Sequence, residues 1–219
     1  MAERNAYFTI YRGGTGEVVE KKSRFIGETA RVTDEEQAAA FVEGIRKHYY
    51  DARHHCFAYV IGADGKLMRA ADDGEPQGTA GKPMLEVLTG RGLANTIVVV
   101  TRYFGGTLLG TGGLVRCYTA AAQAALDNSV IVEKKPGTRG VVRAEYAEIG
   151  KLQYLFAQEA VPVVDTQYAD SVSIEIVIPL ERDQAIRKAI TEKTAATAAI
   201  DEIGECVFAL KNGEPMFFA

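Results

Sequence analysis

Hydrophobic and polar positions in the first 130 residues predict an alternation of strands and helices. Strands are expected at residues 6–11, 16–32, 54–61, 66–69 and 96–103. Helical spacing predicts helices at residues 34–50, 79–89 and 112–127, with Thr33 and Glu36 as the first capping box and Thr79 capping the second. Segment 96–103, TIVVVTRY, is expected to be the buried central strand. These elements predict an α+β domain of two layers, with the helices on one face of the sheet.

The pattern after residue 140 predicts a second, simpler set of elements. Strands are expected at residues 140–147, 161–168, 171–179 and 203–210, with helices at 148–159 and 180–193. The order βαββαβ is that of the ferredoxin-like motif. Between the two sets, residues 133–140 (EKKPGTRG) are polar and contain one proline and two glycines, which predicts the domain boundary here. We therefore expect two domains, residues 1–135 and 140–219.

Length and composition limit the class of protein. The 219 residues suffice for one large or two small domains. No apolar run approaches the roughly 18 residues of a membrane span, and the N-terminus lacks a secretory signal pattern, so we expect a cytoplasmic protein with no membrane partner. Cys56, Cys117 and Cys206 are too few and too scattered for a disulfide framework or a zinc site, and we expect reduced, mostly buried thiols.

The charge of the chain is small and unevenly distributed. A net charge of −4 argues against a generic nucleic-acid binder, for which a strongly basic domain is expected. Residues 1–135 contain 17 Lys and Arg against 16 Asp and Glu, a net charge of +1, whereas residues 136–219 contain 8 against 13, a net charge of −5. An anion is therefore expected to bind the first part of the chain.

A glycine-rich segment joins the central strand to the third helix. Residues 102–116 read RYFGGTLLGTGGLVR, and the glycines are Gly105, Gly106, Gly110, Gly112 and Gly113. Glycine allows close backbone approach to a ligand, and a helix N-terminus adds free N–H donors, so the segment fits an anion site. Flanking arginines suit phosphate oxygens and nearby aromatic rings can stack on bases; these residues are Arg102, Arg116, Tyr103, Phe104 and Tyr118. Alternatively, the glycines form a tight turn and the aromatic side chains are core.

A second polar segment, residues 72–83, reads DDGEPQGTAGKP. Its carboxylates Asp72, Asp73 and Glu75 can hold a magnesium ion, supply an acid and a base, or form a solvated acidic turn. Lys82 is unfavourable in the first turn of a helix, which favours a neighbouring anion.

Two basic or metal-ligating segments complete the candidates. His54 and Cys56 share one face of a strand and His55 takes the other, but further zinc ligands are missing, so His54 remains as a binding candidate. Arg24 lies in a basic patch, KKSR, which is typical of a solvated strand edge and would also add to an anion-binding face.

Four of these segments resemble one known family. KKSRFI, ARHHCFAY, DDGEPQGTAGKPML and VVVTRYFGGTLLGTGGLVRCY occur in the order typical of the Impact family and of its bacterial YigZ-type two-domain branch. The resemblance implies an N-terminal domain similar to domain 2 of ribosomal protein S5 and a ferredoxin-like C-terminal domain similar to the last domain of elongation factor G. Eukaryotic members are similar to translation regulators, and the bacterial branch implies a nucleic-acid or translation role without an established reaction.

Three functions are compatible with these observations. The favoured one is a non-enzymatic protein that binds RNA, the ribosome or a translation factor, and regulates translation. In it, phosphates contact Arg24, Lys82, Arg102 and Arg116, and bases stack on Tyr103 and Phe104. The second is a magnesium-dependent nucleotide enzyme or phosphometabolite-binding protein that uses the same loop. The third is a protein-interaction module that docks a partner through its acidic C-terminal part.

Overall fold

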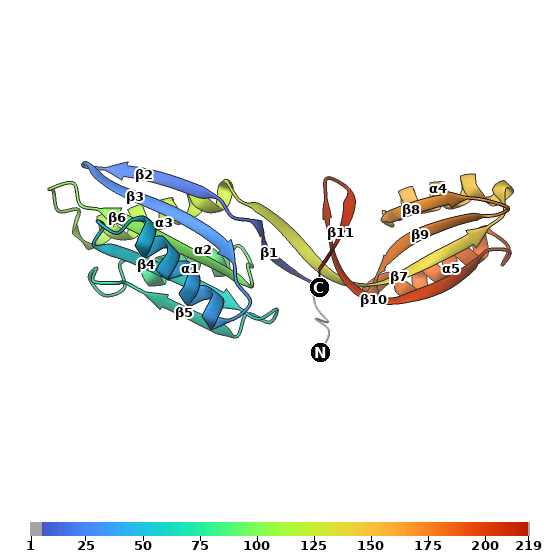
Figure 1. Ribbon diagram of the computed structural model, residues 1–219, viewed down its shortest axis with the longest axis horizontal. Coiled ribbons are helices and arrows are strands. Elements are labelled where there is room, and N and C mark those ends of the chain that lie inside the picture. Colours follow the sequence, from blue (N-terminus) through green and yellow to red (C-terminus); the bar gives the residue numbers. More distant parts are fainter. Residues whose placement is uncertain (1–5, 219) are drawn as a thin grey trace. The chain divides into compact units, whose positions relative to one another are not determined.

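The computed structural model describes residues 6–218, which form two compact units: Tyr7–Val132, and Ala6 together with residues 133–218. Each unit contains a sheet of mostly antiparallel pairs together with α-helices, so the molecule has a mixed α/β fold in two parts (Figure 1). Within the described residues, no helix has the length and apolar character that a membrane crossing requires.

The first unit is built on a five-stranded sheet of order β2-β3-β6-β4-β5. The strands of this sheet are β2 (Thr15–Glu20), β3 (Ser23–Arg31), β4 (His54–Ile61), β5 (Leu67–Ala71) and β6 (Thr96–Tyr103). Strand β1 (Tyr7–Arg12) is not one of them and pairs with β7 (Val130–Ala144). The helices of the unit are α1 (Glu35–His48), α2 (Gly81–Gly90) and α3 (Gly110–Asp127). Strand β6 is central and lies within the range expected from its β-branched sequence.

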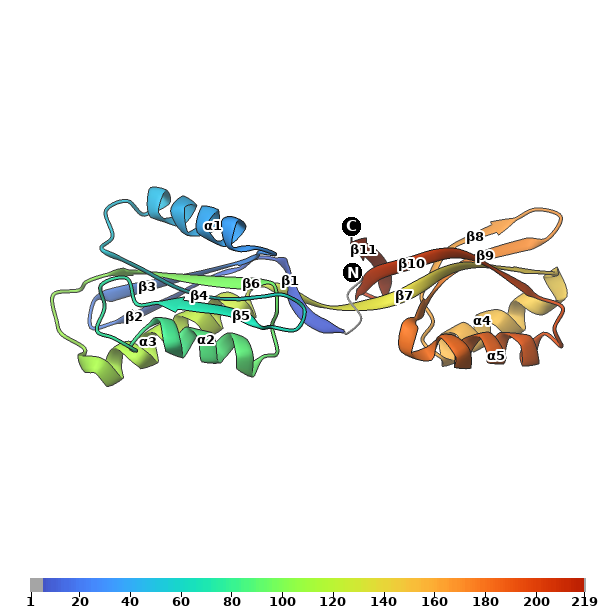
Figure 2. The same ribbon diagram turned by 90° about the horizontal axis from the view of Figure 1, so that it is seen from below.

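Helices cover both faces of this sheet, so the expectation of two layers was wrong. Ile97 and Val99 of β6 pack with α1, whereas Val98 and Val100 pack in the core formed with α2 and α3. Figure 2 shows α1 on one side of the sheet and α2 and α3 on the other. Successive residues of a strand point to opposite faces, so the unbroken apolar run in β6 is a consequence of burial on both.

Local geometry corrects two further expectations. The run 16–32 is a hairpin rather than one strand, because Lys21 and Lys22 both adopt positive φ (46° and 67°) and turn the chain between β2 and β3. The N-cap of α1 is Asp34, whose carboxylate accepts from the backbone N–H of Gln37 at 2.8 Å, and not Thr33.

The second unit has the expected βαββαβ order with an added strand. Its elements are β7 (Val130–Ala144), α4 (Ile149–Gln158), β8 (Val163–Tyr168), β9 (Val172–Pro179), α5 (Asp183–Lys193), β10 (Ala199–Lys211) and β11 (Glu214–Phe218), and β7 begins in the first unit. The strand order is β11-β10-β7-β9-β8, and apolar residues of β7 and β9 form one core with α4 and α5. Residues 133–140, expected to hold the domain boundary, lie inside β7, and the chain divides into its two units at the start of this segment, between Val132 and Glu133.

Candidate functional site

The glycine-rich loop between β6 and α3 lies against the β2–β3 turn. A Cβ atom at Gly105 would lie 2.1 Å from the carbonyl carbon of Lys22, a distance no side chain tolerates. The Gly105 N–H donates to Ser23 Oγ at 3.0 Å. Glycine at this position therefore allows two distant segments, the basic KKSR patch and the loop, to come together.

The first turn of α3 is open and lacks negative charge. It contains no acidic residue and has no side-chain cap, and Gly110 begins it with φ of 73°. The Arg116 guanidinium lies 3.8 Å from where a Cβ of Gly112 would be, so it folds back along this turn. Free N–H groups and a neighbouring guanidinium make the turn favourable for an anion.

Exposed cationic and apolar side chains surround this turn. Lys21, Lys22 and Arg116 are exposed and form no ion pair within the described residues. Phe104 is 55% exposed and Leu108 83% exposed. We call this set the α3 N-terminal surface, which consists of Lys21, Lys22, Phe104, Gly106, Leu108, Gly110, Gly112 and Arg116. Gly113, the remaining glycine of the segment, is buried in the helix.

Arg102 lies beneath this surface rather than on it. It is 6% exposed, and its Nη1 donates to Glu75 Oε1 at 2.6 Å in a buried ion pair. Its guanidinium also lies 5.3 Å and 5.6 Å from the ring centroids of Phe25 and Phe104. Arg102 is therefore placed to hold the loop and the Phe104 ring, and it does not present its charge to a ligand at the surface.

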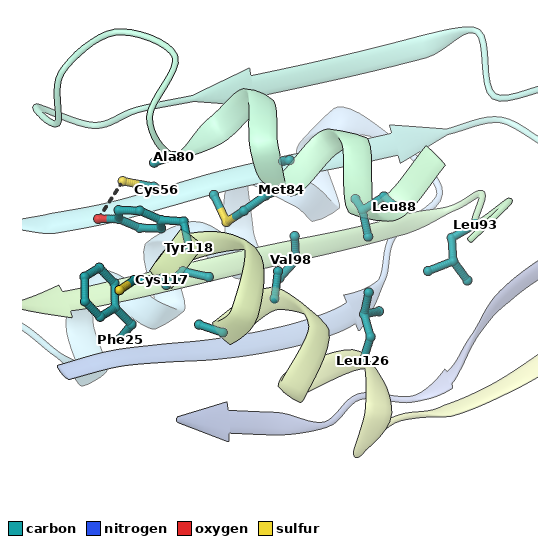
Figure 3. Packing of buried hydrophobic residues seen from close by; sticks show 14 of the residues in the cluster. Phe25, Cys56, Ala80, Met84, Leu88, Leu93, Val98, Cys117, Tyr118 and Leu126 are labelled. Atoms are coloured by element: carbon teal, nitrogen blue, oxygen red, sulfur yellow. Dashed lines mark hydrogen bonds between the residues drawn. The ribbon is translucent and has the colours of Figure 1, made fainter. Parts of the chain in front are cut away.

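A buried polar chain continues from Glu75 into the core. The Tyr118 hydroxyl donates to Glu75 at 2.8 Å. It also lies 3.3 Å from the Cys56 thiol, and Figure 3 shows this contact. Burial raises the pKa of Tyr118 and of Cys56 far above their usual values, so both remain protonated. Tyr118 is fully buried beside Phe25, which corrects its interpretation as a stacking face.

Asp72 caps α2, the role that the sequence suggested for Thr79. Its carboxylate accepts from the backbone N–H groups of Gly78, Ala80 and Gly81 at 2.8–3.0 Å. Burial acts to raise the pKa of Asp72, but these hydrogen bonds outweigh it and hold the pKa below its usual value. Thr79 instead donates to the carbonyl of Pro76.

The three carboxylates of the acidic loop have separate protein partners. Asp73 accepts from Arg46 at 2.8 Å and from the backbone N–H of His55 at 2.7 Å, while Asp72 caps α2 and Glu75 pairs with Arg102. Among residues 6–218, no group of three His, Cys, Asp or Glu side chains is arranged to hold a metal ion. The loop is organised by hydrogen bonds to the protein, and the magnesium-dependent alternative gains no support from this geometry.

Lys82 and His54 flank the acidic loop. Lys82 is exposed and lies 4.0 Å from Glu86, and the anion at the start of its helix is Asp72. His54 Nδ1 lies 2.9 Å from the Asp73 carbonyl, and His55 on the opposite face is buried, as strand alternation predicts.

Arg24 and Tyr103 lie on the other face of the sheet. They pair across β3 and β6 in the register that points toward α1, whereas Arg102 points toward α2 and α3. Arg24 forms a two-pronged ion pair with Glu17 at 3.0 Å, and the Tyr103 hydroxyl donates to Asp51 at 2.7 Å. Arg24 and Arg102 thus lie on opposite faces of the sheet.

Comparison with known proteins places the chain in a family. The Impact N-terminal domain model matches residues 21–126, and a second model, described as a domain of unknown function, matches residues 142–197. The IMPACT family member YvyE of Bacillus subtilis (strain 168) is 39% identical over 204 residues, covering 93% of this chain and 94% of that protein. The IMPACT family member YigZ of Escherichia coli (strain K12) is 42% identical over 161 residues, covering 73% and 79%. A crystal structure described as that of a hypothetical protein matches with a TM-score of 0.59 and 34% identity, covering 92% of this chain and 98% of that one. The chain therefore belongs to the IMPACT family.

Proposed function

We propose that this protein is a non-enzymatic regulator of translation that binds RNA, alone or within the ribosome, through the α3 N-terminal surface. The observation that carries the proposal is the open first turn of α3 beside three exposed cations, Lys21, Lys22 and Arg116. Backbone N–H groups and cations together suit a phosphate group. The family resemblance supports the translation role.

Exposed apolar side chains on the same surface favour RNA over a free phosphate. Phe104 offers an exposed ring at the edge of the turn, and Leu108 lies at the tip of the loop. Unpaired bases stack on such rings, which contributes about 1–3 kcal/mol per base. Arg102 and Glu75 act indirectly in this proposal, because they fix the position of Phe104 from below.

The finer fold assignments belong to the same proposal. We take residues 1–135 as an S5 domain 2-like domain and residues 140–219 as a ferredoxin-like domain, and we place the protein in the cytoplasm. The βαββαβ order of the second unit and its sheet order β10-β7-β9-β8 support the ferredoxin-like assignment.

Fluorescence anisotropy with a labelled single-stranded RNA tests the proposal on the full chain. Arg116→Ala is expected to weaken binding several-fold, and Phe104→Ala to weaken it by about fivefold or more, the loss of one stacking contact. Arg12→Ala is the matched control, because Arg12 is an exposed arginine at the end of β1, three residues before β2 begins, and not at the turn of Lys21 and Lys22. Equal affinity of Arg116→Ala and Arg12→Ala would remove the assignment of this surface.

A further inference from the structure

A cavity of about 410 Å³ lies on the face of the first unit opposite the α3 N-terminal surface. It is formed between α1 and strands β4 and β5, and Figure 2 shows α1 alone on that side of the sheet. We call it the α1 groove; it is lined by Glu35, Ala38, Ala39, Val42, Glu43, Arg46, Phe57, Tyr59 and Arg69. Its volume is within the range of pockets that hold small ligands.

The middle of the helix side and the floor of the α1 groove are apolar. Ala38, Ala39 and Val42 form the helix side, and the two alanines leave space where larger side chains would fill it. Phe57 and Tyr59 form the floor, with parallel rings whose centroids lie 6.1 Å apart. Such walls suit a flat aromatic ring better than a bulky aliphatic group.

One charged side chain in the α1 groove has no partner. The Tyr59 hydroxyl donates to Glu35 at 2.6 Å, Arg69 lies 3.8 Å from Glu35, and Arg46 is paired with Asp73. Glu43, in contrast, has no hydrogen bond or ion pair among the described residues. The groove therefore presents a free carboxylate beside an apolar and aromatic surface.

We propose that the α1 groove binds a guanine nucleotide. A carboxylate has two acceptor oxygens, and guanine is the common base whose Watson–Crick edge offers two adjacent donors, the ring N–H and the exocyclic amino group. Adenine offers one donor beside an acceptor, which would face a carboxylate oxygen. With Glu43 holding this edge, the purine would pack against the aromatic floor of Phe57 and Tyr59.

The other end of the α1 groove supplies a cation for the phosphate. Glu35 and Glu43 are eight residues apart on α1, which corresponds to about 12 Å along the helix. Arg69 lies at the Glu35 end, its side chain is 66% exposed, and its 3.8 Å separation from Glu35 is longer than a hydrogen bond. Arg69 can turn toward a phosphate at small cost, because Glu35 keeps the hydrogen bond from Tyr59.

Thermal unfolding and calorimetric titration of the full chain test this site. GMP is expected to raise the unfolding temperature and to give a measurable Kd, and AMP and inorganic phosphate are expected to give smaller or no shifts. Glu43→Gln is expected to weaken GMP binding about tenfold, because one charged acceptor is lost and an amide donor faces the base. Arg69→Ala is expected to weaken GMP binding but not guanosine binding.

Glu36→Gln is the matched control, since Glu36 is an exposed glutamate of the same helix outside the groove lining. It should leave the GMP affinity unchanged, and each variant's unfolding temperature without ligand reports whether it is folded. Three results would overturn the assignment: no response to GMP, an equal response to AMP, or a response to N-acetyl-arginine amide in place of GMP, which would assign the groove to an arginine side chain. Because the groove and the α3 N-terminal surface share no residue, Arg116→Ala should leave GMP binding unchanged, so each proposal can fail alone.

Discussion

At the scale of single residues, the carboxylate of Asp72 caps helix α2. The N-cap residue of the helix makes no such side-chain hydrogen bond itself. Three backbone N–H groups donate to it, and Asp72→Asn is expected to lower the free energy of unfolding at pH 7 by about 1–2 kcal/mol. The family segment DDGEPQGTAGK thus contains a structural acid as its first residue.

The contribution of Asp72 depends on pH in a defined direction. Its pKa in the folded protein is lowered, so the stabilisation is complete above the unfolded pKa of about 3.9 and is lost as the pH falls through the folded pKa. Urea unfolding at pH 7 and at pH 3 is expected to show a smaller difference between Asp72→Asn and the native protein at pH 3. A difference that grows on acidification would contradict this role.

The buried pair of Arg102 and Glu75 is expected to behave as a coupled unit. Arg102→Met leaves a buried carboxylate without its cation and should destabilise the protein by about 3–5 kcal/mol. Adding Glu75→Gln to that variant should recover part of the loss, because the uncompensated charge is removed. A double-mutant cycle measured by chemical denaturation checks this, and additive effects of the two substitutions would show that the pair is not coupled.

At the scale of elements, glycines with opposite surroundings predict opposite effects of the same substitution. Gly105→Ala places a methyl group against the backbone of Lys22 and should cost about 1–3 kcal/mol or more. Gly44→Ala, in the middle of α1 with no atom within 4 Å of the added carbon, should stabilise by about 1 kcal/mol. Thermal unfolding of the two variants provides a matched comparison; stabilisation by Gly105→Ala would show that the loop does not need this close approach.

The elements were largely predictable because their signals are local. β6 and α3 follow from a β-branched run and from helical spacing in adjacent residues. The coverage of both sheet faces by helices was missed, although the sequence of β6 indicates it. Ile97 and Val98 point to opposite faces, and both are apolar. Periodicity predicts which residues are buried in an element but not which side of a sheet a helix covers.

The errors arise where residues far apart in the sequence determine the local structure. Pro136 and Gly137 lie in the expected boundary between strand patterns, yet β7 continues through them, and a Cβ at Gly137 would lie 2.8 Å from the Phe208 ring of β10. Arg102 was expected to contact phosphate at the surface. It is buried because it pairs with Glu75, which lies 27 residues earlier, so the residues next to Arg102 do not indicate its burial. The glycine-rich turn itself was found from sequence, since its glycines and the helix spacing that follows are contiguous.

At the scale of the whole molecule, the small net charge limits how an RNA would be held. A protein of net charge −4 repels polyanions at long range, so binding must rest on local contacts. On the α3 N-terminal surface three cations, Lys21, Lys22 and Arg116, are available for phosphates. The affinity for RNA is therefore expected to be modest. The slope of its logarithm against the logarithm of salt concentration is expected to be small, because it is proportional to the number of phosphate contacts.

The salt dependence of RNA binding tests the central claim most directly. The logarithm of Kd for a labelled single-stranded RNA is measured against the logarithm of potassium chloride concentration for the full chain, Arg116→Ala and Arg12→Ala. With three phosphate contacts the slope should be about 2, and Arg116→Ala should lower it by about 0.7 while Arg12→Ala leaves it unchanged. A slope near zero for the native chain, or the same slope in Arg116→Ala, would contradict phosphate binding at the α3 N-terminal surface.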